Sequence, residues 1–149
     1  MITIFGITLL SGDIWLKFLI AVVCATAIGL ERNYKNKPVG VRTCNLVTIG
    51  AMIFIILGHS FGVTAGDPTR TLGQIIVALG WLGAGGIFKD SNNTITGMTS
   101  GAVIWILAAI GCAIGLGLYQ LALVTTGFVG FVLFTAGKLE HKFKNWMHD

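Results

Sequence analysis

The sequence has few charged residues, few acids and few prolines. Only 11% of its 149 residues are charged, with six acids against ten bases, whereas 54% are hydrophobic. A soluble protein of this length needs polar side chains over most of its exterior, and so few charges do not supply them. Together with a mean hydropathy of +0.84, this composition indicates an integral membrane protein.

Motifs for metal-dependent hydrolysis and for nucleotide binding are also missing. The sequence has no HExxH or GxxxxGK[ST] motif, and its one GxSxG match, "GHSFG" (58–62), lies in an apolar segment and not at a strand-to-helix turn. We therefore expect neither an enzyme nor a bound cofactor. Its three cysteines, Cys24, Cys44 and Cys112, are odd in number and far apart, which predicts buried free thiols rather than disulfides or a CxxC metal site. Whether the protein binds a metal is left open.

Five apolar segments approach the length of about 20 helical residues that a bilayer requires. We therefore predict an all-α bundle of five transmembrane helices, forming one domain over residues 1–149. The stretch "GLGLYQ" (115–120) favours a tight turn between the last two helices over one overlong helix. The basic tail, 138–149, either lies along the membrane or extends the fifth helix. The predicted spans are 14–31, 44–63, 71–88, 99–117 and 119–137.

Basic residues gather in the odd-numbered loops and the tail. Eight lie there: Arg32, Lys35, Lys37, Arg42, Lys89, Lys138, Lys142 and Lys144; only Lys17 and Arg70 lie toward the other side. By the positive-inside rule, the C-terminus is cytoplasmic and the N-terminus is outside. The net charge of +4 comes from short loops beside apolar segments, which favours anionic lipid headgroups over nucleic acid as the partner.

The stretch "GLERNYKNKPVGVRT" (29–43) concentrates charge in an otherwise apolar region. Orientation requires only the bases, yet the stretch also contains Glu31, and Pro38 and Gly40 shape the turn. Two interpretations stay open. The loop is only a topology anchor, or it is a structured site in which Glu31 pairs with Arg42 or another base.

Twenty-one glycines predict close helix packing, because small residues let helix backbones approach in lipid. We expect the third and fourth helices to pack most tightly, and the protein to form a homo-oligomer, most plausibly a dimer. The double glycine at 85–86 is also a candidate helix break. The predicted packing residues are Gly80, Gly83, Ala84, Gly85, Gly97, Gly101, Gly111 and Gly115.

Polar candidates for function lie near the two ends of the spans, and no carboxylate lies in the middle of one. Asp67 and Arg70 lie toward the outer end, with Asp67 as a helix cap; Asp13 and Thr43 are the predicted caps of the first two helices. Glu31 and Asp90 lie toward the cytoplasmic end. The full set of functional candidates is Glu31, Arg32, Lys37, Arg42, Asp67, Arg70, Lys89 and Asp90.

Five motifs in this order resemble the amino-terminal membrane domain of the MgtC/SapB family: "GLER" (29–32), "KPVGVRT" (37–43), "DPTR" (67–70), "GWLGAGGIFKD" (80–90) and "GMTSGAVIW" (97–105). The resemblance covers about residues 14–137. It implies a bacterial inner-membrane protein linked to growth under magnesium limitation and, in pathogens, to survival inside host cells. It also implies a regulatory role, with the F-type ATP synthase as a suggested partner.

The family pattern is matched at many positions, and the sequence departs from it in two motifs. The family's "GLTTAA" reads "GMTSGA", and Trp81 replaces a phenylalanine-like residue. Many relatives carry a soluble C-terminal domain; we expect none here, because the sequence ends about a dozen residues after the last span. The matched positions are Glu31, Arg32, Lys37, Pro38, Gly40, Arg42, Thr43, Asp67, Arg70, Gly83, Gly85, Lys89, Gly97 and Trp105.

Three functions are compatible with these features. The first is a non-catalytic modulator of another membrane protein, linked to magnesium homeostasis and acting through the 31–42 loop. The second is a channel or carrier for a cation or small solute, such as a magnesium transporter. The third is a purely structural scaffold.

Overall fold

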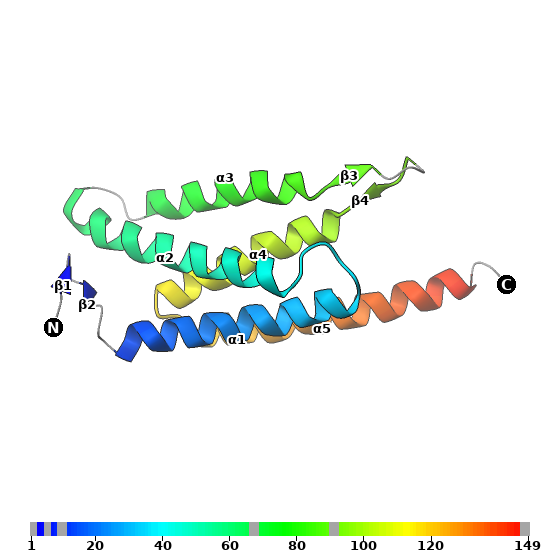
Figure 1. Cartoon of the computed structure of the whole chain (residues 1–149), viewed down its shortest axis with the longest axis horizontal. Helices are drawn as coiled ribbons and strands as arrows, with labels where there is room; N and C mark the ends of the chain where they lie inside the picture. The colour runs from blue at the N-terminus through cyan, green and yellow to red at the C-terminus, as the bar shows by residue number, and fades with distance from the viewer. Residues whose placement is uncertain (1–2, 5–6, 9–11, 66–68, 90–92, 147–149) are drawn as a thin grey trace.

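The computed structural model describes residues 3–4, 7–8, 12–65, 69–89 and 93–146 (Figure 1). Five α-helices follow one another in alternating directions, which confirms the predicted all-α class and helix number. They are α1 (Gly12–Tyr34), α2 (Val41–Ala65), α3 (Thr69–Gly85), α4 (Met98–Gly115) and α5 (Tyr119–Trp146). Strands β1 (Thr3–Ile4) and β2 (Ile7–Thr8) pair before α1, and β3 (Phe88–Lys89) and β4 (Ile95–Thr96) pair between α3 and α4.

The bundle has two ends that differ in their connections. The end on the right of Figure 1 contains the 35–40 connection, the β3–β4 hairpin and the point where α5 continues past the other helices. We call it the loop end. The opposite end contains the start of α1 and the 116–118 connection between α4 and α5, and we call it the turn end.

Four of the described helices are long and apolar enough to cross a membrane: α1, α2, α4 and α5. Helix α3 has 17 residues, about 26 Å of helix, and ends three residues before the predicted limit of 88. The helix ends here because of the double glycine at 85–86, the candidate helix break predicted from the sequence. The amides of Gly86 and Ile87 donate to the carbonyls of Gly83 and Ala84 at 3.1 and 3.0 Å, which tightens the last turn and ends the helix.

The predicted hairpin between the last two helices is confirmed. Helix α4 ends at Gly115 and α5 begins at Tyr119. Gly117 takes a left-handed conformation with φ of +79°, and the Leu118 amide donates to the Ala113 carbonyl at 2.8 Å, so the last carbonyls of α4 are satisfied. At its other end α5 continues as helix through Trp146, so the basic tail extends the fifth helix for most of its length.

Two predicted helix starts need correction. Helix α2 begins at Val41, two residues before Thr43, because the Gly40 carbonyl already accepts from the Cys44 amide at 3.0 Å. Helix α1 begins at Gly12, so Asp13 lies in its first turn and not at a cap. The proposed cap at Asp67 lies outside the described residues.

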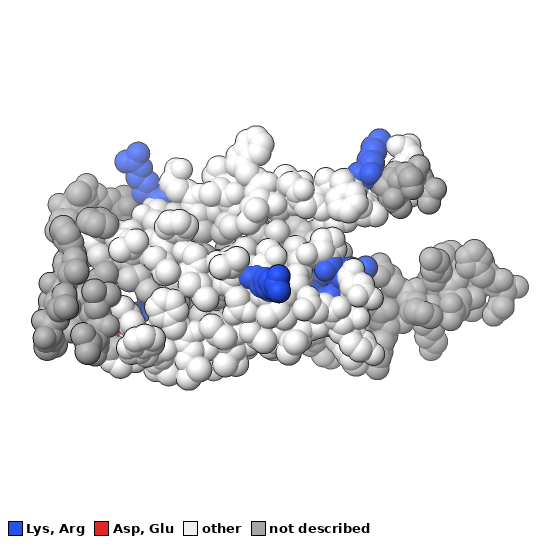
Figure 2. All heavy atoms as spheres, in the orientation of Figure 1, with Lys and Arg blue, Asp and Glu red and all other residues white. Residues whose placement is uncertain are grey.

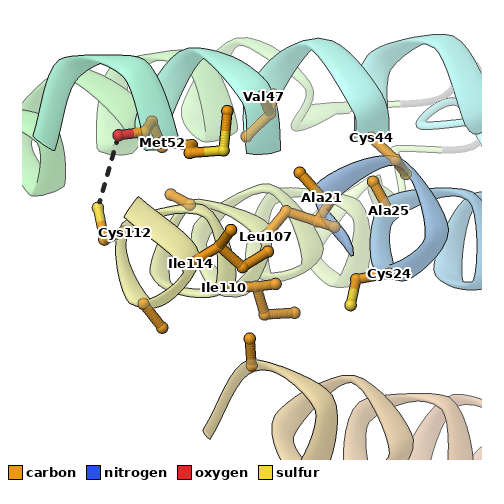
Figure 3. Packing of buried hydrophobic residues seen from close by; sticks show 14 of the residues in the cluster. Ala21, Cys24, Ala25, Cys44, Val47, Met52, Leu107, Ile110, Cys112 and Ile114 are labelled. Carbon is orange, nitrogen blue, oxygen red and sulfur yellow. Dashed lines mark hydrogen bonds between the residues drawn. The ribbon is translucent and has the colours of Figure 1, made fainter. Parts of the chain in front are cut away.

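The core lies between α1, α2 and α4 (Figure 3). Ile28 of α1, Met52 of α2 and Leu107, Ile110 and Ile114 of α4 are fully buried. The three cysteines are buried and free, as predicted. The Cys112 thiol points to the Ala51 carbonyl with a sulfur to oxygen distance of 4.0 Å. Large apolar side chains therefore fill the middle of the bundle.

Glycines lie at the closest contacts between helices, but the helix pair predicted to pack most tightly is not the one with the largest interface. The largest helix interface is between α2 and α4, not between α3 and α4. A Cβ at Gly111 would clash with the Thr48 carbonyl, and one at Gly115 would lie 2.9 Å from the Met52 carbonyl. Glycine at these two positions therefore lets α2 and α4 pack backbone to backbone.

Helices α3 and α4 do touch through glycine at one point. A Cβ at Gly83 would lie 3.2 Å from the Gly101 carbonyl oxygen, and one at Gly101 would lie 3.0 Å from that of Gly83. Gly97 has φ of +92° and would clash with the Gly86 carbonyl if it carried a Cβ, so it serves the hairpin turn rather than a helix face.

Three predicted packing residues lie open in the single chain. A Cβ at Gly80 or Gly85 would meet no atom within 4 Å, and Ala84 is exposed. Their predicted packing role is therefore not seen within the chain, because α3 buries only Ile75 and Gly83 among its residues.

Candidate functional site

The charged stretch at the loop end is folded onto the bundle. Its residues divide into two sets: Arg32 and Val39 are buried at 2% and 5% exposure, whereas Tyr34 is 89% exposed and Lys37 and Arg42 are also exposed. The turn is held by backbone hydrogen bonds, including Lys37 N to Arg32 O at 3.0 Å. The stretch therefore has a defined structure, as the second of the two interpretations predicts.

Two close contacts fix the path of this connection. A Cβ at Gly29 would lie 2.6 Å from the Cα of Val41, so α1 and the start of α2 touch through backbone. A Cβ at Gly40 would clash with the Asn33 side chain. Residue Asn36 supplies the left-handed conformation that the turn needs, with φ of 52°, and asparagine tolerates it better than most residues.

Arg32 is a charged residue whose side chain is buried. It lies in the last turn of α1, and its Nη2 donates to the Ser100 Oγ at 2.9 Å, in the first turn of α4. Its Nε is buried without a hydrogen-bond partner among the described residues. The C-terminal end of α1 favours a cation there, but burial of an arginine with one hydrogen bond is costly.

Glu31 pairs with a base other than Arg42. Its Oε1 lies 2.7 Å from Lys35 Nζ, in an ion pair whose geometry is not that of a hydrogen bond. Its Oε2 is buried with no partner among the described residues. Lys35 Nζ also donates to the Leu133 carbonyl at 2.6 Å. The pair therefore joins α1 to α5 beside Arg32, and we call Glu31, Arg32, Lys35 and Ser100 the Arg32 site.

A second polar network lies at the turn end. Lys17 Nζ is 3.2 Å from Asp13 Oδ2 and donates to the Gly115 carbonyl at 3.1 Å. Tyr119 donates from its hydroxyl to Asp13 Oδ1 at 2.6 Å. A lysine at the C-terminal end of a helix stabilises the unpaired carbonyls there. Lys17 therefore does not extend away from the bundle; its ammonium group contacts the end of α4.

Between the two ends, polar side chains are few. Asn45 Nδ2 donates to Thr26 Oγ1 and to the Val41 carbonyl, both at 3.0 Å. Thr48 Oγ1 is buried and has no partner among the described residues. No group of three His, Cys, Asp or Glu side chains that could hold a metal ion occurs in the described part of the chain.

The predicted polar candidates are thus only partly brought together. Glu31 and Arg32 belong to the Arg32 site, and Lys37, Arg42 and Lys89 lie exposed at the same end. Arg70 lies exposed at the turn end. Asp67 and Asp90 lie outside the described residues, so their functional roles stay predictions. Basic side chains on the face in Figure 2 stand singly on a largely uncharged surface.

Sequence reasoning missed Ser100, Asn45 and the burial of Arg32. A signal for Arg32 was available. Ala21, Ala25, Ile28 and Arg32 fall at helical spacing of four, three and four residues, and all four are buried. That spacing places Arg32 on the inward face of α1.

Comparison with known proteins identifies relatives over most of the chain. The MgtC family model matches residues 18–142. "Protein SapB" of Bacillus subtilis is 37% identical over a match that covers 80% of this chain and 55% of that protein. "Putative magnesium transporter YhiD" of Escherichia coli K12 is 33% identical, over 76% of this chain and 56% of that protein. "Protein MgtC" of Brucella abortus is 39% identical, over 68% of this chain and 42% of that protein.

The chain therefore spans about half the length of these relatives. No solved structure matches it. The family model covers far more than half of the residues, and it includes both the Arg32 site and the α2–α4 interface. The chain belongs to the MgtC family.

Proposed function

We propose that this chain is a multi-pass bacterial inner-membrane protein of magnesium homeostasis, which acts without catalysis by binding another membrane protein at its loop end. Family membership and the magnesium-related name of the Escherichia coli relative support the magnesium link. One observation carries the mode of action. Buried Arg32 and Val39 hold the 35–40 connection in place, while Tyr34 and Lys37 project from it fully or largely exposed.

The proposed orientation places the loop end in the cytoplasm and the N-terminus outside. Lys37, Arg42 and Lys89 are exposed near this end, and basic residues concentrate on the cytoplasmic side of membrane proteins. The proposed partner surface, which consists of Tyr34 and Lys37, would then face partners in the cytoplasm or in the membrane. The F-type ATP synthase is the partner that the family resemblance suggests.

The packing of the bundle favours a modulator over a transporter formed by one chain. Met52, Leu107, Ile110 and Ile114 are buried together at the α2–α4 interface and the adjoining core. These large side chains fill the space that a permeation path between α1, α2 and α4 would need, and interiors packed in this way admit little beyond isolated water.

Magnesium transport is the second candidate function. It is favoured by the Escherichia coli relative's name and by the Glu31 carboxylate, whose Oε2 is buried without a partner among the described residues. A carboxylate oxygen is a ligand that Mg²⁺ prefers. A transport path between two or more copies of the chain would avoid the α1–α2–α4 core, which large side chains fill in one copy.

A growth experiment tests the modulator. The chain is expressed in a bacterium that lacks its own relative, and growth is measured in low magnesium. A Tyr34→Ala, Lys37→Glu variant removes the exposed partner surface and should abolish the growth advantage at an unchanged membrane level. An Arg70→Glu variant, which changes an exposed base at the turn end, serves as control and should grow as the native chain does. Native growth of the first variant would refute the proposed surface.

Purified protein in liposomes separates the two functions. The modulator proposal predicts no magnesium uptake above that of protein-free liposomes. Uptake that is lost in Glu31→Gln but kept in the Tyr34→Ala, Lys37→Glu variant would instead establish the transporter.

A further inference from the structure

An apolar groove runs between α2 and α3 on the outside of the bundle. Its volume is about 430 Å³, and apart from Thr43 its lining is apolar. Leu46 and Phe54, on the α2 side, are 74% and 61% exposed, and Leu82, on the α3 side, is 50% exposed. The groove therefore opens sideways toward the region that lipid occupies in a membrane.

The length and depth of the groove match one acyl chain of one leaflet. On α2 the lining extends from Thr43, near the loop end, to Phe54, which is about 16 Å of helix. Half of a hydrocarbon core of about 30 Å is about 15 Å. The lining on α2 is therefore about as long as one leaflet of hydrocarbon is deep, and buried Ile75 of α3 belongs to the same lining.

A basic residue stands at the mouth of this groove. Arg42 is exposed and precedes Leu46 by one helical turn, and Leu46, Gly50 and Phe54 continue that row at intervals of four along the groove. Residues four apart lie on one face of a helix. Arg42 therefore lies just beyond the loop-end limit of the lining, at the end of the groove where the headgroup of a bound lipid would be, and arginine can bind a phosphate with two parallel hydrogen bonds.

We propose that the α2–α3 groove is a binding site for one anionic phospholipid, with an acyl chain along Leu46, Gly50 and Phe54 and the phosphate at Arg42. Charge complementarity at the mouth and the one-leaflet depth select this occupant. The site does not depend on the proposed function, and its test uses neither Tyr34 nor Lys37.

Gly50 supplies a sharp test of the groove. A Cβ at Gly50 would meet no atom within 4 Å, so a larger side chain can enter the groove without a clash in the core. Gly50→Leu should therefore fold and block the chain site, while Gly50→Ala should leave room for it. Gly127→Leu is the matched control, because Gly127 is an exposed glycine of α5 with no atom within 4 Å of its Cβ position.

The experiment uses the full chain in nanodiscs that contain either phosphatidylglycerol or phosphatidylcholine with a photoactivatable acyl chain. Labelled residues are mapped by mass spectrometry. We expect the groove residues of the native chain to be labelled above the exposed face of α5, with phosphatidylglycerol preferred. Arg42→Gln should reduce that preference about fivefold, the effect of one basic residue near an anionic lipid. Gly50→Leu should reduce groove labelling by both lipids.

Three results would overturn the proposal. The first is equal labelling of the groove and of the outer face of α5, which indicates only the annular lipid that surrounds any membrane protein. The second is an unchanged headgroup preference in Arg42→Gln. This variant changes only an exposed side chain, so its result is informative even if Gly50→Leu does not fold. The third is efficient disulfide formation between two Leu46→Cys chains, which places a second copy in the groove.

Discussion

Replacing Arg32 with methionine tests whether this buried cation stabilises the fold. The side chain keeps much of its length but loses its charge and its hydrogen bond to Ser100. Burial of an ion costs several kcal/mol. The compensation seen among the described residues is one charge-assisted hydrogen bond of about 1.5–3 kcal/mol and a helix-end interaction of at most about 2 kcal/mol. We therefore expect Arg32→Met to leave the free energy of unfolding within about 1 kcal/mol of native, or to raise it.

Ser100→Ala should have the opposite effect. It leaves the buried guanidinium without its described hydrogen-bond acceptor, which costs about 2 kcal/mol and lowers the midpoint of thermal unfolding by about 6 °C, at about 3 °C per kcal/mol for a chain of this size. In the Arg32→Met background the same change should cost less than about 0.5 kcal/mol, because the interaction it removes is already gone.

The chain contains its own reporter for this measurement. Cys24, Cys44 and Cys112 are buried and free, so a thiol-reactive fluorophore in mild detergent reacts as the bundle unfolds. Equal costs of Ser100→Ala in both backgrounds would show that Arg32 and Ser100 do not interact. A fall of more than about 9 °C for Arg32→Met, equal to about 3 kcal/mol, would show that the charge is stabilising and would refute the reasoning.

Three further changes should follow from the packing. Gly111→Leu forces a side chain against the Thr48 carbonyl and should cost at least about 3 kcal/mol in thiol-reporter unfolding, whereas Gly127→Leu, at an open position, should cost less than about 0.5 kcal/mol. Gly97→Ala puts a Cβ on a residue with φ of +92° and against the hairpin, so protease cleavage at the hairpin should rise at least several-fold. Lys17→Met removes the donor to the last carbonyl of α4 and should cost about 1 kcal/mol, seen as a lower unfolding midpoint.

The helices could be predicted because the bilayer imposes their length. Each apolar segment is bounded by polar or glycine-rich residues, and the turn at Gly117 follows from the excess length of the last apolar stretch. Charges were expected at the ends for the same reason, and the described ones lie there. The C-terminal end of α3 was harder to predict. Gly85 and Gly86 favour the end of the helix, whereas the apolar residues Ile87 and Phe88 favour its continuation.

Helix partners could not be predicted from glycine alone. A small residue indicates that some backbone approaches closely, but it does not specify which helix does so. Gly111 and Gly115 belong to the same helix as Gly101, yet they face α2 while Gly101 faces Gly83 of α3. Partner choice depends on the summed fit of side chains along both helices, and that information is distributed over α2 and α4 rather than contained in a motif.

The buried face of α1 could have been predicted from the spacing of its residues. Lys17, Ala21, Ala25, Ile28 and Arg32 follow one another at steps of four or three residues, so a cation stands at each end of a row whose members are small or apolar. Arginine and lysine at the ends of a span are usually read as reaching outward to water. The spacing instead places both on the face that packs against other helices, and both cations donate to α4.

These two cations contact the two ends of α4. Lys17 and Arg32 are fifteen positions apart in the sequence, as are Ser100 and Gly115. The antiparallel helices therefore match over about 22 Å, with Arg32 bound to the first turn of α4 and Lys17 to its last carbonyl. Sliding α4 by one helical turn would break both hydrogen bonds together. The 35–40 connection follows the same end of α1. A force on that connection would therefore move α1 and α4 together as a rigid pair, so a partner bound at the loop end would act on both helices.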